Sequence, residues 1–335
     1  MRVPYDELKY EIRRVIMAAG LPAEKAEICA GIHADSSRDG IYSHGADRVV
    51  RFVDYLKKGW VQAEAEVSLE KAAGALEVYN GNLGPGILNA LFCTERGMAL
   101  AERFGIGLVG IHNTTHWMRG GTYGLHAARR GFAAIAWTNT ESCMPPWGGR
   151  ECRLGNNPFV MAAPVEGGAP LLLDMAMTQY SYGKLGTTRL AGKKLPFPGG
   201  FDERGDLTCD PGAIEATMRA LPIGFWKGSA FSFMLDVLGA ILSDGIAAAD
   251  IDQVGKGSCG GASQVFIIIN PDRCAESGRA AGIIRKAQEY IKSSAPAVET
   301  GDIHWPGEGV LRNREKNTAE GVFVDDTIWA GIKAL

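Results

Sequence analysis

Gly255-Lys256-Gly257-Ser258-Cys259-Gly260 reproduces the glycine spacing G-x-G-x-x-G and is followed by the apolar run Val265 to Ile269. In a Rossmann domain this spacing follows a strand and opens a helix, whose N-terminus receives a pyrophosphate. Here the glycines come before a strand, so we interpret them as a flexible loop. The rest of the sequence contains neither another copy of this fingerprint nor a P-loop pattern. The sequence therefore argues against a Rossmann fold.

Strand-like and helical patterns alternate along much of the chain. Buried strands are predicted from short apolar runs bounded by turn residues, at 76–79, 106–111, 132–138, 159–165, 171–175 and 265–269. Helices are predicted from the turn cluster at 80–86 up to 104, and at 121–130, 226–242, 279–291 and 326–335. This alternation predicts an α/β chain with a mixed sheet. The stretch 193–225, rich in glycine and proline, is expected to be a long irregular excursion, which in compact domains is often functional.

Three amphipathic helices are predicted before the first strand. The first covers residues 5–19 and is closed by Gly20, and the second opens at Pro22 and runs to about residue 38. The third is expected to have Ser43 as its N-cap and to stop at Gly59. The chain therefore begins with a helical segment.

The length of 335 residues suggests about two domains. We expect a helical N-terminal segment at 1–74 and a mixed-sheet domain at 75–280. The C-terminal helices at 281–335 are expected to pack back on the N-terminal segment.

Composition excludes several classes of function. Lys and Arg number 35 against 38 for Asp and Glu, a net charge of −3, which argues against nucleic acid or an acidic membrane as the main partner. The seven cysteines are widely spread without a C-x-x-C pair, which argues against a disulfide scaffold or structural zinc. No apolar stretch reaches about 18 residues, and the N-terminus lacks the apolar run of a signal peptide. We expect a cytoplasmic protein.

The segment from Asp39 to Arg51 combines a histidine with two arginines. His44, Arg48 and Arg51 are spaced i, i+4 and i+7, so on the predicted helix their side chains share one face. Arg48 could hold a carboxylate with two hydrogen bonds, and His44 could donate a proton to an alkoxide beside it. A solvated surface helix explains the same spacing, so both interpretations stay open.

A second polar segment, His112 to Gly121, leaves the predicted strand 106–111. Polar and aromatic residues at a strand end are typical of ligand sites. His112 and His116 have an i, i+4 spacing that suits a metal on a helix, but no carboxylate or thiolate is near in sequence. We therefore predict no metal site.

Two further places have a structural and a ligand-binding interpretation. Asp174 follows the apolar run 171–173, as either a structural cap or a site residue. Trp226-Lys227 begins a long apolar helix, where the helix N-terminus and a lysine could hold a phosphate. A simple helix start fits the second place equally well.

Distinctive short motifs run through the whole chain. They are Tyr42-Ser43-His44-Gly45, His116-Trp117-Met118-Arg119-Gly120-Gly121, Met144-Pro145-Pro146-Trp147-Gly148, Glu151-Cys152-Arg153, Tyr180-Ser181-Tyr182-Gly183, Arg189-Leu190-Ala191-Gly192, Trp226-Lys227-Gly228-Ser229 and Val324-Asp325-Asp326. From about residue 5 to residue 335, the chain resembles the malate/L-lactate dehydrogenase family, which lacks a Rossmann fold.

The resemblance implies a homodimer with a mixed-sheet, non-Rossmann NAD(P)-binding fold that uses NADH, with NADP as the alternative. It implies that His44 is the proton donor with Ser43 beside it, that Arg48 clamps a carboxylate, and that His116 lines the same pocket. The implied cofactor-binding residues are Pro170, Leu171, Leu172, Leu173, Asp174, Met175, Ala176, Trp226, Lys227, Gly307, Glu308 and Gly309.

The string beginning at His116 resembles a subgroup that acts on a small sugar acid. The implied reaction is NADH-dependent reduction of the 2-keto group of 2,3-diketo-L-gulonate to 3-dehydro-L-gulonate, with the proton from His44. Alternative substrates within the family are malate, lactate, ureidoglycolate or a cyclic imino acid. Two alternatives from other classes are a hydrolase that depends on His44, which would lack the Gly-x-Ser-x-Gly elbow, and a non-catalytic sugar-acid binding protein.

Overall fold

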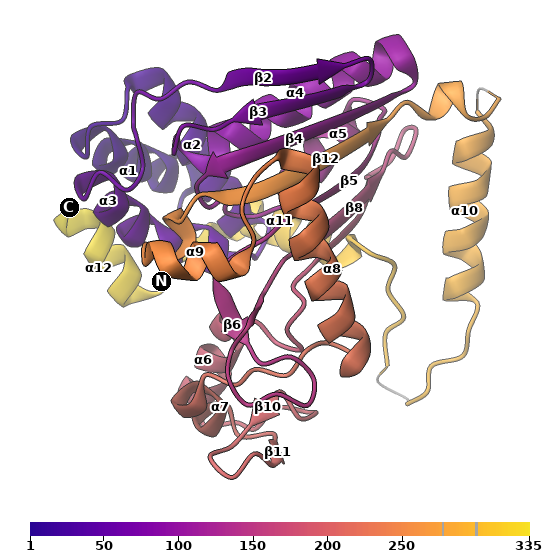
Figure 1. Cartoon of the computed structure of the whole chain (residues 1–335). Helices are drawn as coiled ribbons and strands as arrows, with labels where there is room; N and C mark the ends of the chain where they lie inside the picture. The colour runs from indigo at the N-terminus through magenta and orange to yellow at the C-terminus, as the bar shows by residue number, and fades with distance from the viewer. Residues whose placement is uncertain (277, 299–300) are drawn as a thin grey trace.

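Seven strands form one mixed sheet at the centre of the protein (Figure 1). The computed structural model describes residues 1–276, 278–298 and 301–335. The strand order is β2-β3-β4-β12-β5-β8-β9, in which β3 and β4 are parallel and the other neighbours are antiparallel. The strands are β2 (Ser68–Ala73), β3 (Leu76–Asn80), β4 (Ile106–Thr114), β5 (Ala133–Thr138), β8 (Phe159–Ala163), β9 (Leu171–Met175) and β12 (Ala262–Ile269). The predicted mixed-sheet α/β fold with a helical N-terminus is confirmed.

Helices cover both faces of the sheet. α4 (Gly86–Phe104) and α5 (Gly121–Arg129) pack on one face, and α8 (Trp226–Ser243) packs on the other. Along β12, Phe266 and Ile268 join the core under α4, while Val265 joins the core under α8, as strand alternation requires. A Cβ at Gly97 would lie 2.5 Å from Ile268 Cγ1, so glycine allows α4 to approach the sheet this closely.

The N-terminal helices form a separate core with the C-terminal end of the chain. They are α1 (Tyr5–Ala18), α2 (Ala23–Arg38) and α3 (Val49–Lys57). Trp329 and Ile332 of α12 (Asp326–Ala334) are buried in this core against α1 and α3. α11 (Glu308–Glu320) contacts α2, and β1 (Arg2–Val3) pairs with β13 (Val322–Phe323). α10 (Arg279–Lys292) has no buried residue and stands at the side of the molecule in Figure 1.

The predicted third helix is wrong in its first half. The chain makes two 3-10 turns, Tyr42–His44 and Ala46–Arg48, before α3 begins at Val49. Gly45 separates the turns with φ −109° and ψ −123°, outside the helical region. Ser43 is therefore not an N-cap, and the predicted placement of His44 on the first turn of an α-helix is wrong.

Other predicted elements need smaller corrections. β2 has no counterpart in the prediction because all six of its residues are exposed and give no apolar alternation. β4 continues to Thr114, so the predicted strand exit at His112 lies within the strand. The predicted strand 159–165 ends at residue 163.

The stretch 193–225 is not wholly irregular. Together with α6 (Tyr182–Leu190) it forms a small lobe around Leu185, Leu195 and Ile214. The lobe's other elements are α7 (Pro211–Thr217), β10 (Gly200–Phe201) and β11 (Leu207–Thr208). The remaining elements outside the main sheet are β6 (Ser142–Met144), β7 (Leu154–Gly155) and α9 (Ala248–Val254).

Among the helices in the described ranges, none is both long and apolar enough to cross a membrane by itself. The bent pair of α8 and α9 passes that test of length and composition only when the two are taken together.

Candidate active site

Residues 42–48, here called the His44 loop, are held against α2 by two hydrogen bonds and by close packing at Gly45. His33 Nδ1 lies 3.0 Å from the carbonyl oxygen of Gly45, and the Ala46 amide donates to Ser37 Oγ at 2.8 Å. A Cβ at Gly45 would lie within 3.0 Å of both Ser37 and His33 atoms, so only glycine fits there without a shift. The loop is thereby fixed in a shape that a continuous helix could not provide.

His44 meets His116 across the site. The two imidazole rings are stacked, with centroids 5.7 Å apart and planes 16° from parallel. Ser43 Oγ lies 3.0 Å from His44 Nδ1, which leaves His44 Nε2 available to a ligand. The Met118 amide donates to His116 Nδ1 at 2.9 Å, so the neutral ring carries its hydrogen on Nε2 and is a hydrogen-bond donor there.

Burial and positive charge keep both histidines neutral in the free site. Burial lowers the pKa of His44 to about 3, and the charges of Arg48 and Arg119 add to the effect. Burial also lowers the pKa of His116 well below its ordinary value, again with Arg48 as the next cause. Arg48 is therefore close enough to act electrostatically on both rings, although it is not on a shared helical face with His44.

Arg48 has no carboxylate partner among the described residues. Within residues 1–276, 278–298 and 301–335, no Asp or Glu oxygen lies within 4.0 Å of its guanidinium, and its buried Nε has no hydrogen-bond partner. Burial lowers the pKa of Arg48, and the neighbouring Arg51 adds to this. A buried guanidinium is stabilised by an anion, so this position suits a ligand carboxylate.

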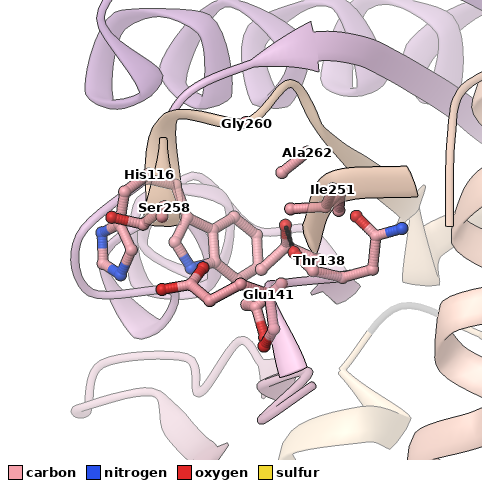
Figure 2. Close-up of a pocket in the computed structure, with 11 residues that line it drawn as sticks. His116, Thr138, Glu141, Ile251, Ser258, Gly260 and Ala262 are labelled. Atoms are coloured by element: carbon pink, nitrogen blue, oxygen red, sulfur yellow. Dashed lines mark hydrogen bonds between the residues drawn. The ribbon is translucent and has the colours of Figure 1, made fainter. Parts of the chain in front are cut away.

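A pocket opens beside His116, and Figure 2 shows the side chains around it. Its lining comes from the end of β5, the segment after β4, α9 and the turn before β12, and includes His116, Trp117, Thr138, Asn139, Thr140, Glu141, Ile251, Gly257, Ser258, Gly260 and Ala262. The glycine segment 255–260, interpreted from the sequence as a flexible loop, contains a 3-10 turn at Gly257–Cys259 and forms part of this wall.

Glu141 is a pocket residue that the sequence analysis does not identify. Its Oε2 is buried and has no hydrogen-bond partner. Burial raises the pKa of its carboxyl, while Arg48 and Arg51 act in the opposite direction. The available signal is an acidic residue three positions after the strand-ending Thr138.

A buried ion pair joins the two histidine-bearing segments. Asp39, at the end of α2, binds Arg119 at 2.5 Å and Arg314 of α11 at 2.6 Å. Arg119 follows His116 by three residues and is only 3% exposed, and its Nε also lies 3.6 Å from Asp174. These charges hold the His44 loop, the segment after β4 and α11 in one arrangement.

Two of the three implied cofactor-binding segments meet. The Leu172 amide donates to the Pro306 carbonyl at 3.1 Å, and Gly307, at φ +98°, packs on the backbone of β9. The Asp174 carboxylate accepts from the Gly121 amide at 2.9 Å, and burial raises its pKa. Segment 170–176 therefore lies between the start of α5 and the start of α11. Its residues are Pro170, Leu171, Leu172, Leu173, Asp174, Met175 and Ala176.

The side chains of the other implied cofactor residues are less suited to a phosphate. The Glu308 carboxylate is bound by Lys292 at 2.8 Å and His304 at 3.1 Å, so this side chain is already engaged within the protein. Trp226 and Lys227 begin α8, where both are exposed, Trp226 by 61%. They form a third group, at the point where the chain leaves the stretch 193–225 and enters α8.

No group of three or more His, Cys, Asp or Glu side chains suited to a metal occurs in the part of the chain that the structure describes. His112 instead contacts Glu70 at 2.9 Å, away from His116.

The sequence matches the malate/L-lactate dehydrogenase family over residues 3–333, and the chain belongs to this family. It is an NAD(P)-dependent oxidoreductase, as the sequence analysis predicts. The 2,3-diketo-L-gulonate reductase of Citrobacter koseri is 40% identical over 336 residues and both chains are covered completely, at 100%.

Solved structures with the same fold are named for other substrates. Sulfolactate dehydrogenase from Methanocaldococcus jannaschii has a TM-score of 0.90 at 28% identity, over 100% of this chain and 96% of that one. Malate dehydrogenase from Pyrococcus horikoshii has a TM-score of 0.90 at 27% identity, over 100% and 94%. The shared fold therefore does not select among these acids.

Proposed function

We propose that this enzyme uses NADH to reduce the C2 ketone of 2,3-diketo-L-gulonate to 3-dehydro-L-gulonate. The observation that carries the reaction type is the buried, unpaired guanidinium of Arg48 beside the stacked pair His44 and His116. The full-length similarity at 40% identity to proteins named for this reaction supports the particular substrate.

Arg48 binds the substrate carboxylate with two charge-assisted hydrogen bonds and so orients the neighbouring C2 carbonyl. His116 donates its Nε2 hydrogen to the carbonyl oxygen without losing it, because Nδ1 is held by the Met118 amide. Such a donor stabilises the negative charge that develops on the oxygen.

His44 supplies the proton that completes the alcohol. The product gains one hydride at carbon and one proton at oxygen, and the proton is replaced from solvent. In the free site the pKa of His44 is about 3, with burial and Arg48 as the first two causes. A substrate carboxylate paired with Arg48 cancels part of that positive field, so substrate binding raises the pKa of His44 toward the range useful in general acid catalysis.

Gly121 and Gly307 allow close packing where β9 meets α5 and α11, because a Cβ would lie 2.5 Å from Asp174 Oδ2 at the first position and 3.1 Å from the Leu172 amide nitrogen at the second. The match to the family supports a cofactor-binding role for these segments. We assign Pro170 to Ala176, Gly307 to Gly309, and Trp226 with Lys227 to cofactor binding. When bound, the reduced nicotinamide supplies the hydride. NADH is the proposed donor, and NADPH is the second nucleotide to test.

The test is a spectrophotometric screen of the purified chain. It compares 2,3-diketo-L-gulonate with oxaloacetate, pyruvate, the keto acid that corresponds to ureidoglycolate, and cyclic imino acids. Each is assayed with NADH and with NADPH. We expect the highest kcat/KM for the diketo sugar acid with NADH. A higher value for another keto acid would replace the substrate, and turnover without a nucleotide would support a hydrolase instead.

We also propose that the enzyme is a homodimer. Besides Trp226, α8 carries five large apolar side chains that are between 37% and 67% exposed, namely Phe231, Phe233, Met234, Leu238 and Ile241. An apolar surface of this kind is typical of a protein–protein contact. Light scattering should give twice the chain mass of 35.8 kDa, and Phe233→Glu should shift it to the monomer. All seven cysteines are free, which suits the proposed cytoplasmic location.

A further inference from the structure

In or near the pocket beside His116, two buried polar atoms of opposite character have no hydrogen-bond partner among the described residues. Glu141 Oε2 belongs to the pocket wall, and Arg48 Nε lies outside the lining, but the Arg48 charge acts on both Glu141 and His116. The two groups influence each other's charge but are not within 4.0 Å of each other. A ligand that satisfies both must present an anion to the first and a hydrogen-bond donor to the second.

We propose that Glu141 determines substrate specificity by accepting a hydrogen bond from a hydroxyl or ammonium group on the substrate tail and by excluding a second carboxylate. This inference rests on the proposed function, because it takes Arg48 as the group that holds the first carboxylate. It identifies the substrate class as a monoanionic 2-keto acid with a donor-bearing tail.

The position of Glu141 supports this assignment. It lies three residues beyond the end of β5, opposite the turn before β12, where its Oε1 is 3.9 Å from the place a Cβ at Gly257 would occupy. Figure 2 shows Glu141, His116 and Ser258 among the residues that surround the pocket. The tail of an acid whose carbonyl is at His116 therefore extends along a wall that includes this carboxyl.

The negative charge of Glu141 would select against substrates that carry a second carboxylate. Two carboxylates that meet in a partly buried site repel each other, which lowers the affinity for a dicarboxylate relative to a monoanion. A hydroxyl, in contrast, donates to the Glu141 oxygen that has no partner in the protein. Oxaloacetate, whose second carboxylate reaches this end, is therefore a poor substrate, although structural relatives are named as malate and sulfolactate dehydrogenases.

The test compares oxaloacetate with 2-ketobutyrate, a monoanion of similar length, at pH 8. Glu141→Gln keeps the shape of the side chain and removes its charge. We expect this variant to raise the ratio of kcat/KM for oxaloacetate over that for 2-ketobutyrate at least tenfold. Glu151→Gln is the matched control, because Glu151 is an exposed acid ten residues further along, and it should leave the ratio unchanged.

An unchanged ratio in Glu141→Gln would overturn the inference. An equal loss of kcat/KM for both acids would overturn the inference too, since it would mean that Glu141 only orients Arg48. If the wild-type chain reduces neither acid, calorimetric binding of malate and 2-hydroxybutyrate to wild type and variant decides the inference by the same ratio. The proposed function is tested separately, by the screen that includes 2,3-diketo-L-gulonate. Circular dichroism and thermal unfolding of the variant establish that it is folded.

Discussion

Replacing Asp39 by Asn tests whether the buried ion pair holds the two histidine-bearing segments together. Asn has nearly the same shape, so the substitution removes charge without opening a cavity. It leaves Arg119, which is 3% exposed, without its main counter-ion, and the remaining carboxylate, Asp174, is 3.6 Å away. Breaking a buried pair by removing one partner costs about 3–5 kcal/mol. Arg314 adds little to this cost, because its side chain is 25% exposed and can be solvated.

This magnitude converts to a measurable change in melting temperature. An unfolding entropy of about 2.1 cal/mol/K per residue gives about 0.7 kcal/mol/K for 335 residues. A loss of 3–5 kcal/mol therefore lowers Tm by about 4–7 °C. The assay is thermal unfolding followed by circular dichroism at fixed concentration and pH.

Asp54→Asn is the matched control, since Asp54 makes an exposed ion pair with Lys58 at 2.7 Å. Exposed pairs contribute about 0.2–1 kcal/mol, so Tm should fall by less than about 2 °C. A Tm for Asp39→Asn that matches the control would refute the view that this carboxylate stabilises the arrangement around the site.

Two predictions concern the chemistry. Arg48→Lys should raise KM for the keto acid at least about tenfold, because a point charge replaces a two-pronged donor, and an unchanged KM in steady-state assays would remove Arg48 from substrate binding. His44 has its pKa lowered to about 3 in the free chain, so its proton-donating form grows as pH falls. The kcat/KM for reduction should therefore rise as pH is lowered from 8.5 to 6, and a fall over that range would contradict the assigned role.

The main sheet could be predicted from sequence because its strands are buried and apolar. β12 contains the apolar run 265–269 and β4 the run 106–111, and the glycine spacing before β12 already argues against a Rossmann arrangement. β2 could not be found in this way, since its six exposed residues are ordered by pairing with β3 and not by burial.

The site was only partly predictable. His44, Arg48 and His116 are picked out by residue type and motif, but the helical spacing used to join the first two is not what brings them together. Gly45 breaks the helix, and contacts with His33 and Ser37 of α2 then shape the loop. Local periodicity cannot reveal such contacts, because they depend on tertiary packing.

Glu141 and Asp39 illustrate a second reason why the site could be predicted only in part from the sequence. Each is an ordinary acidic residue in sequence, and its importance arises from burial and from which cations lie near it. Burial of a charge is a property of the whole fold, so a single sequence gives little sign of it.

The most direct test of the proposed mechanism is the kinetics of His44→Ala with the keto acid and NADH. Loss of general acid catalysis should lower kcat by about 10²–10⁴, while the Kd for NADH, measured by fluorescence, stays within about threefold of wild type. His126→Ala is the control, because that imidazole, on α5, pairs with Glu95 on α4 and should be dispensable. A near-normal kcat in His44→Ala would contradict the role of His44 as the proton donor.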